Sequence, residues 1–260
     1  MKMIKILLSI TLTTVLSMAQ DNKDQDIDGV PDNIDQCIDT PFLDEVDETG
    51  CSVSSHLDFS FGYGFSTNED LVDRETQHAA KFQIVYYLNN WSYALRTGYF
   101  LVDDGEMQDT IVKIKRKFKL NKALNISFGA GIKLPTYKIK GNRVDYTLYS
   151  SIVSYPLSSL SVFAGANHTF VNDKEITVPI QDTNTAYIGT GYFFTKDLYA
   201  NLTYSYAQSK FATNHAAKSF SSTIFYKIDE KWFTTLSYGH QIDDDDLHNS
   251  LNLKFGYSLW

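Results

Sequence analysis

The sequence predicts an all-β protein, in which a short acidic loop segment precedes an antiparallel up-and-down β-barrel that spans a membrane. Apolar and polar residues alternate with a period of two over most of the chain, which is the pattern of strands with one apolar face. The connections between these strands are alternately long and short, as they are in bacterial transmembrane barrels. The excess negative charge lies in one segment before the first strand.

The first residues have the features of a secretory signal peptide, which we predict over residues 1–19. Lys2 and Lys5 are basic, residues 6–16 are mostly apolar, and Ser17 and Ala19 offer small side chains for cleavage. A membrane anchor that stays attached is the alternative, but polar residues begin at Asp21, soon after the short apolar stretch. We expect export to a compartment in which disulfides form.

Charge divides the rest of the chain near residue 53. Residues 20–53 contain eleven acidic residues and one basic residue, a net charge of −10, whereas residues 54–260 contain equal numbers of both. The change coincides with the start of the strand pattern, so we predict two domains, 20–53 and 54–260. Because the whole chain has a net charge of −8, we expect no binding to nucleic acid.

The acidic segment contains regularly spaced oxygen ligands. Positions 1, 3, 5, 9 and 12 of a loop are carboxylates, which belong to Asp24, Asp26, Asp28, Asp32 and Asp35. Gly29 at position 6 permits a sharp turn, and Val30 at position 7 can offer its backbone carbonyl. Calcium binds about six to eight oxygens, and alternate spacing lets a tight loop surround one ion. We therefore expect calcium as a cofactor, and a solvated acidic linker is the alternative.

Residues 24–51 resemble a thrombospondin type 3 repeat of the bacterial kind. The matching pattern is D-x-D-x-D-G-x-x-D-x-x-D-x-C, then T-P and V-D-x-x-G-C, and its later members are Cys37, Thr40, Pro41, Val46, Asp47, Gly50 and Cys51. The resemblance implies a calcium-binding segment. In bacteria such repeats often lie beside an outer-membrane barrel, as in OmpA-like porins.

Cys37 and Cys51 are the two cysteines of the chain, too few for a cysteine-rich metal site. In an oxidising compartment we expect them to form a disulfide, with two free thiols as the alternative. Closing a loop of this length would stabilise the segment by about 3 kcal/mol through the lost entropy of the unfolded chain.

Twelve strands are predicted from the alternation, with ten to fourteen possible. In residues 124–134, for example, Leu, Ile, Phe and Ala alternate with Asn, Ser, Gly and Lys. All five prolines fall outside the predicted strand interiors, as the missing backbone N–H requires. The predicted strands are 56–66, 78–88, 91–102, 110–119, 123–134, 143–154, 158–170, 184–194, 198–207, 217–228, 231–240 and 249–260.

The connections give the expected topology. Short turns are predicted at 89–90, 120–122, 155–157, 195–197 and 229–230, and longer loops at 67–77, 103–109, 135–142, 171–183, 208–216 and 241–248. Short turns of bacterial barrels face the periplasm. Both ends of the chain, and with them the acidic segment, are therefore expected in the periplasm.

A soluble sandwich or lipocalin-like barrel would show the same alternation with its apolar face inside. The membrane is favoured because the strands have about the 9–11 residues that a tilted span needs. Aromatic residues recur near strand ends, and twelve strands enclose a space too wide for side chains to fill. The strand that ends at Trp260 resembles the C-terminal signal of outer-membrane barrels. We expect the bacterial outer membrane, with its lipid, lipopolysaccharide and barrel-assembly machinery as partners.

The polar strand faces suggest a function. In 110–119 the alternate residues on one face are basic, and we predict a pore lined by Lys113, Lys115, Lys117, Lys119, Arg96 and Lys133. Arg116 falls on the apolar face, where its side chain must extend towards the membrane surface. The polar faces together carry ten bases against two acids, Asp58 and Asp145, which favours anions.

We predict a small porin or channel for ions or small anionic solutes. The alternative is a structural or adhesive barrel, closed because loop acids fold inward and pair with the lysines. Catalysis is not expected, since His240 near Asp243 to Asp246 is the one rim cluster of suitable residues and His168 has no evident serine partner. The oligomeric state is not predicted.

Overall fold

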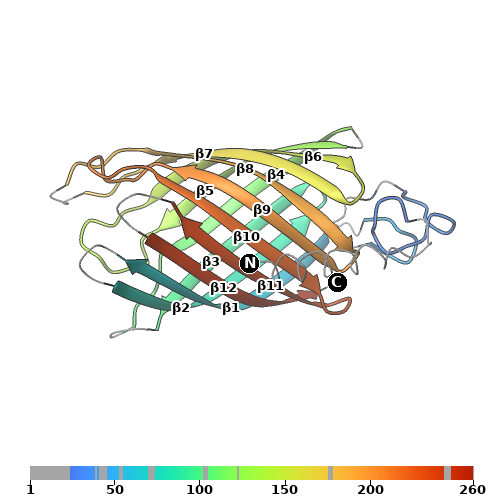
Figure 1. Cartoon of the computed structure of the whole chain (residues 1–260), viewed down its shortest axis with the longest axis horizontal. Helices are drawn as coiled ribbons and strands as arrows, with labels where there is room; N and C mark the ends of the chain where they lie inside the picture. The colour runs from blue at the N-terminus through green and yellow to red at the C-terminus, as the bar shows by residue number, and fades with distance from the viewer. Residues whose placement is uncertain are drawn as a thin grey trace, which may run out of the picture.

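The computed structural model describes residues 24–38, 40, 46–52, 55–69, 74–101, 105–121, 123–174, 178–242 and 247–259. The predicted signal peptide, the acids at 243–246 and Trp260 lie outside these residues. From Ser55 to Leu259 the strands form one closed antiparallel barrel (Figure 1). Among the described residues, no helix has the length and apolar character needed to cross a membrane.

Twelve strands build the barrel, which confirms the predicted fold and strand number. Each strand pairs with its neighbours in sequence, and the first closes on the last, where Phe61 lies opposite Phe255. The strands are β1 (Ser55–Glu69), β2 (Arg74–Leu88), β3 (Trp91–Phe100), β4 (Thr110–Asn121), β5 (Leu124–Leu134), β6 (Asp145–Leu157), β7 (Leu160–Phe170), β8 (Thr183–Thr195), β9 (Leu198–Ala207), β10 (Ala217–Lys227), β11 (Trp232–Gln241) and β12 (Leu247–Leu259).

Two details of the prediction are wrong. The first connection spans residues 70–73 rather than 67–77, because the ladder between β1 and β2 continues through polar residues to the Glu69–Arg74 pair. Backbone pairing does not require an apolar side chain, so the sequence pattern ends before the strand does. The predicted turn 155–157 also lies inside β6, and the connection is 158–159 instead. Pro156 is therefore a strand residue, at an irregularity between Ser154 and Leu157 where the ladder tolerates a missing N–H.

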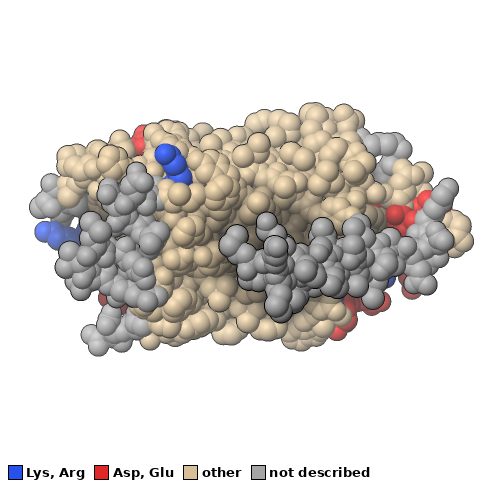
Figure 2. Space-filling model, viewed as in Figure 1, with Lys and Arg blue, Asp and Glu red and all other residues tan. Residues whose placement is uncertain are grey.

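The apolar face of the barrel points outward. Phe61, Phe128 and Leu148 each expose about half of their surface, at 54%, 51% and 54%. The buried hydrophobic residues are few among those described: Ala79, Val85 and Phe193. Figure 2 shows the described charged side chains towards the two ends of the molecule and an uncharged band between them. A transmembrane barrel has this distribution, and the soluble alternative with an apolar interior is wrong.

Long and short connections lie at opposite ends of the barrel (Figure 1). One end, the short-turn mouth, has the connections 89–90, 122–123, 158–159, 196–197 and 228–231. The other end, the long-loop mouth, includes the loops 101–109, 135–144, 171–182 and 208–216. The acidic segment lies beyond the short-turn mouth, and the Lys196 side chain of the β8–β9 turn lies against Gly29. The segment is therefore at the end where both β1 begins and β12 ends.

Candidate functional site: the lumen and the acidic segment

The β4 lysines line the lumen. Lys113, Lys115, Lys117 and Lys119 alternate with outward side chains such as Ile114 and Phe118, which are exposed. The Lys113 ammonium lies 4.4 Å from the centre of the Tyr149 ring on β6. The period-two repeat places all four cations on one inward stripe along β4.

Arg116 points outward, as the sequence register implies. Its guanidinium carbon lies 5.1 Å from the centre of the Trp91 ring and 4.9 Å from that of Phe118. Trp91 is the first residue of β3, so this group lies near the short-turn mouth. The aromatic faces attract the cation and cover its stem, which makes a charge tolerable on the outer surface close to the membrane boundary.

A cavity of about 320 Å³ opens in the lumen between β2, β3, β11 and β12. Its cations are Lys81, Arg96 and Lys254, and the amides of Gln83, Gln108 and Asn252 also line it. Arg96 Nη2 donates to Gln83 Oε1 at 3.2 Å, and Lys81 Nζ donates to Asn252 Oδ1. The strand residues that line the cavity could be predicted from the alternation. Gln108 could not, because it belongs to a loop whose path the sequence does not indicate.

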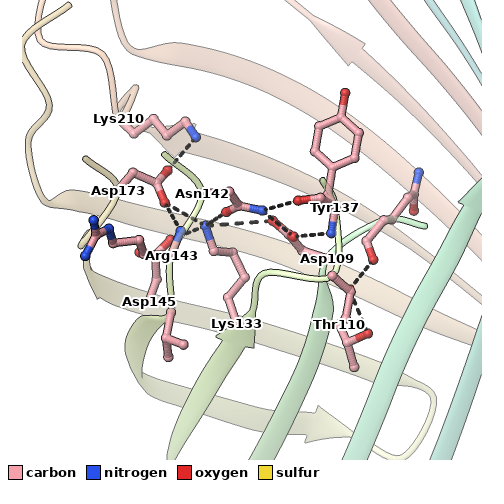
Figure 3. Close-up of polar contacts among 12 residues, drawn as sticks. Asp109, Thr110, Lys133, Tyr137, Asn142, Arg143, Asp145, Asp173 and Lys210 are labelled. Atoms are coloured by element: carbon pink, nitrogen blue, oxygen red, sulfur yellow. Dashed lines mark hydrogen bonds and ion pairs between the residues drawn. The ribbon is translucent and has the colours of Figure 1, made fainter. Parts of the chain in front are cut away.

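Lys133 lies at the long-loop mouth, in a network of polar contacts shown in Figure 3. Its ammonium is 2.6 Å from Asp145 Oδ2, 3.3 Å from Asp173 Oδ1 and 3.8 Å from Asp109 Oδ2. It also donates to Asn142 Oδ1 at 2.9 Å. Lys133 was predicted to line the pore, but the structure surrounds it with carboxylates that compensate its charge.

Asp173 is the most buried acid of this network, with 1% of its side chain exposed. It accepts hydrogen bonds from Lys210 Nζ at 2.8 Å and from the Arg143 backbone N–H at 2.9 Å. Burial raises the pKa of Asp173, but these hydrogen bonds and the charges of Lys133 and Lys210 outweigh it, so the pKa is lowered overall. The network therefore joins loops 135–144, 171–182 and 208–216 to the barrel wall.

Aromatic side chains line the other half of the lumen, from β6 to β11. The rings of Phe193 and Tyr199 lie 4.5 Å apart, and those of Phe225 and Phe233 lie 5.6 Å apart. A side chain at Gly191 would overlap the Tyr199 ring, and one at Gly256 would overlap the Phe233 ring. These rings therefore lie over glycines of neighbouring strands, where no side chain keeps them away from the barrel wall.

The histidines show no catalytic arrangement in the described residues. The His56 ring stacks on Tyr87 at 4.2 Å, and its Nε2 is 3.9 Å from Asp58, which accepts a hydrogen bond from Ser258. Asp58 thus lies between the histidine and the serine, whereas a nucleophilic serine needs the histidine as its direct neighbour. His168 and His240 each contact an asparagine, Asn184 at 2.8 Å and Asn249 at 2.9 Å.

The acidic segment brings carboxylates together. Oxygens of Asp24, Asp26 and Asp28 lie within 4.8 Å of one another. One oxygen each of Asp24, Asp26, Asp28 and Asp35 is buried without a hydrogen-bond partner. The second oxygen accepts a backbone N–H in every case, from Gly29 at 3.0 Å, Thr40 at 2.5 Å, Val30 at 2.7 Å and Cys37 at 2.7 Å respectively.

Burial raises the pKa of Asp26 to about 6, aided by the charges of Asp28, Asp35 and Asp24 and opposed by the Thr40 hydrogen bond. Asp32 also accepts a backbone N–H, from Gln25 at 2.7 Å, but it is not among the residues with a buried oxygen that has no partner. Buried carboxylate oxygens without a donor are costly, and hard cations such as calcium bind such oxygens. The donor set present therefore fits a calcium ion.

The second half of the segment encloses this cluster. Cys37 and Cys51 are joined by a disulfide, with their Cα atoms 5.0 Å apart. Thr40 Oγ1 donates to the Gly50 carbonyl at 2.6 Å. Gly50 has a φ of 76°, and a Cβ there would overlap the Asp35 carboxyl group, so glycine is required both by conformation and by close approach.

Comparisons with solved structures identify the fold. The KdgM porin covers 77% of this chain and 99% of its own, with 16% identity and a TM-score of 0.58. An outer membrane channel from Pseudomonas putida F1 covers 80% and 97%, with 12% identity and a TM-score of 0.63. The NanC porin covers 76% and 100%, with 10% identity and a TM-score of 0.57. No protein-family model and no curated protein sequence matches the chain.

Proposed function

We propose that the protein is an outer-membrane channel for ions or small anionic solutes. The observation that carries the proposal is the cationic half of the barrel wall. Lys81 and Arg96 line one cavity, and Lys113, which begins the row of β4 lysines, lies near enough to Arg96 to be affected by its charge. Rings of fixed positive charge favour anions. The shared fold with the KdgM and NanC porins supports transport, and KdgM has also been solved in complex with disordered oligogalacturonate.

Replacing Lys113, Lys115, Lys117 and Lys119 by glutamine should reduce the preference for anions several-fold. The change removes four positive charges from the lumen and keeps side chains of similar length. The reversal potential of the refolded protein under a salt gradient measures the preference. The control variant replaces Lys138, Lys140, Lys174 and Lys218 together. It has the same change in charge, at three loop residues and at the second residue of β10. An unchanged reversal potential in the β4 variant would show that its lysines do not line the ion path.

A closed structural or adhesive barrel is the second candidate. The network around Lys133 favours it, because Asp109 and Asp173 from two loops, together with Asp145 of β6, compensate the charge of this lysine at that mouth. Single-channel conductance separates the two candidates. We expect discrete single-channel currents. If correctly refolded protein gave no current across the bilayer, the closed barrel would be supported.

The proposal places the short-turn mouth and the acidic segment in the periplasm. A cysteine introduced at Thr213, in a long loop, should react on intact cells with a maleimide too large to cross the barrel. Cysteines at Asn89 or Glu230, which are exposed in short turns, should react only after the cells are broken. Labelling of Asn89 and not Thr213 on intact cells would invert the topology.

We also propose that the acidic segment binds calcium and acts as a stiff periplasmic spacer of the thrombospondin type 3 kind. Asp24, Asp26, Asp28 and Asp35 would offer their unpartnered oxygens, and Val30 its carbonyl. Asp32 has no buried oxygen without a partner, and it would act through water, as position 9 often does.

The remaining partners follow from the barrel surface. The outward apolar band fits outer-membrane lipid, and lipopolysaccharide would surround the long-loop mouth. The barrel-assembly machinery would insert the barrel, with β12 as the strand it recognises.

A further inference from the structure

The cations of the luminal cavity differ from Lys133 in how their charge is compensated. Within the described residues, no ion pair joins Lys81, Arg96 or Lys254 to a carboxylate. Lys81 and Arg96 instead donate to the neutral amides of Asn252 and Gln83. A neutral amide oxygen orients the cation but does not compensate its positive charge. The three residues also repel one another, since Lys254 interacts with the charges of Arg96 and Lys81.

Two glycines in the barrel wall leave room for the side chains of Lys81 and Lys254. Gly62 and Gly64 of β1 point inward between β2 and β12. A Cβ at Gly64 would lie 2.7 Å from Lys81 Cε and from Asn252 Oδ1, and one at Gly62 would overlap the Lys254 side chain. The side chains of Lys81 and Lys254 therefore pass over Gly64 and Gly62, and their ammonium groups lie beside the cavity.

The carboxylate that lines the cavity, that of Asp109, makes its polar contacts outside the cavity. Asp109 lines its edge, but Asp109 Oδ1 accepts the Tyr137 N–H at 3.1 Å and the Asn142 amide at 2.7 Å. Its other oxygen faces Lys133 at 3.8 Å. Asp109 therefore belongs to the network at the long-loop mouth and leaves the three cations uncompensated.

We propose that this cavity binds a small organic anion with two or three carboxylate groups. Several carboxylates would relieve the repulsion among Lys81, Arg96 and Lys254, and the planar guanidinium of Arg96 suits paired contacts to a carboxylate. The amides can bond to hydroxyl or carbonyl groups of the same ligand. A volume of about 320 Å³ is at the lower end of small-molecule sites, which favours one compact anion over a long chain. The inference rests on the proposed channel, whose lumen gives the ligand access.

Calorimetric titration of the full-length refolded protein in detergent tests the site. The probe is tricarballylate, a compact tricarboxylate, in buffer freed of calcium, and acetate is the comparison. We expect saturable binding of one tricarballylate, much weaker binding of acetate, and at least about tenfold weaker tricarballylate binding in Lys81→Gln/Arg96→Gln/Lys254→Gln. The control variant is Lys138→Gln/Lys174→Gln/Lys218→Gln, which removes the same number of positive charges away from the cavity. It should bind tricarballylate as the unaltered protein does.

Equal binding by the cavity variant and the unaltered protein would overturn the site, and so would equal affinity for acetate. Should the triple variant not refold, as judged by heat-modifiable mobility, Lys254→Gln alone should still weaken binding, and unchanged affinity in that variant would have the same meaning. Conductance is measured separately. Binding without conductance would refute the channel and keep the site, whereas conductance without binding would refute the site alone.

Discussion

Replacing Asp173 by alanine should destabilise the loops at the long-loop mouth by about 3 kcal/mol and leave the barrel folded. The Asp173 side chain is 1% exposed and holds Lys210, Lys133 and the Arg143 N–H. Removing one partner of a buried ion pair costs about 3–5 kcal/mol, and the lower value applies because Lys210 is 40% exposed and can turn to water. The barrel keeps its closed ladder, which does not depend on the loops.

Hydrogen exchange of the loop amides in refolded protein measures this effect. Asp182→Ala is the matched control, since Asp182 lies in the same loop but is 49% exposed, and its loss should change exchange much less. The pKa of Asp173 is lowered by folding, so its stabilisation is present above the usual aspartate value and is lost as pH falls through the folded value. Relative to the intrinsic exchange rate at each pH, the loop amides should therefore stay protected at about pH 5 and lose protection only below about pH 4. Unchanged exchange in Asp173→Ala at neutral pH would contradict the role of the network.

The double change Asp26→Ala/Asp28→Ala should abolish calcium binding. It removes two of the three carboxylates whose oxygens lie within 4.8 Å of one another, and two of the four that have a buried oxygen without a partner. For the unaltered protein we expect a Kd of about 10⁻⁴ to 10⁻³ M, typical of extracellular modules. At roughly 1 mM calcium this gives about 0.4 to 1.4 kcal/mol of stabilisation, confined to the acidic segment.

Calorimetric titration of the full chain with calcium, after treatment with a chelator, provides the measurement. Glu48→Ala/Glu230→Ala removes two exposed acids that are not part of the cluster, and it should bind calcium normally. The site would be refuted if Asp26→Ala/Asp28→Ala bound calcium unchanged, or if the unaltered protein bound none at about 5 mM, well above the expected Kd.

The strands could be predicted because each carries its own signal. Alternation in residues 124–134 predicts both the element and its outward face, and the structure has β5 at Leu124–Leu134. The charge of the lumen could not be predicted in the same way. Counting bases and acids on strand faces omits Asp109 and Asp173, which are in loops and reach the lumen wall only in the folded chain.

These loop acids could not be predicted because they are far along the chain from the lysine that they contact. Asp173 is 40 residues from Lys133, and no periodicity relates the two positions. The loop acids reduce the positive charge at one mouth and leave the middle of the lumen cationic. The acidic segment is the opposite case, because its ligand spacing is local and Asp24, Asp26, Asp28 and Asp35 stand close in sequence as well as in space.

In the proposed channel, the glycine beneath an inward ring and the lysines of the opposite wall would affect two different properties. A side chain at Gly191 would overlap the ring of Tyr199 and displace it without altering any charge. Exchanging a lysine on the other half of the circumference would alter ion selection and leave that ring in place. If the barrel is the proposed channel, size selection and charge selection would be controlled by different arcs of its wall, and either could be adjusted independently of the other.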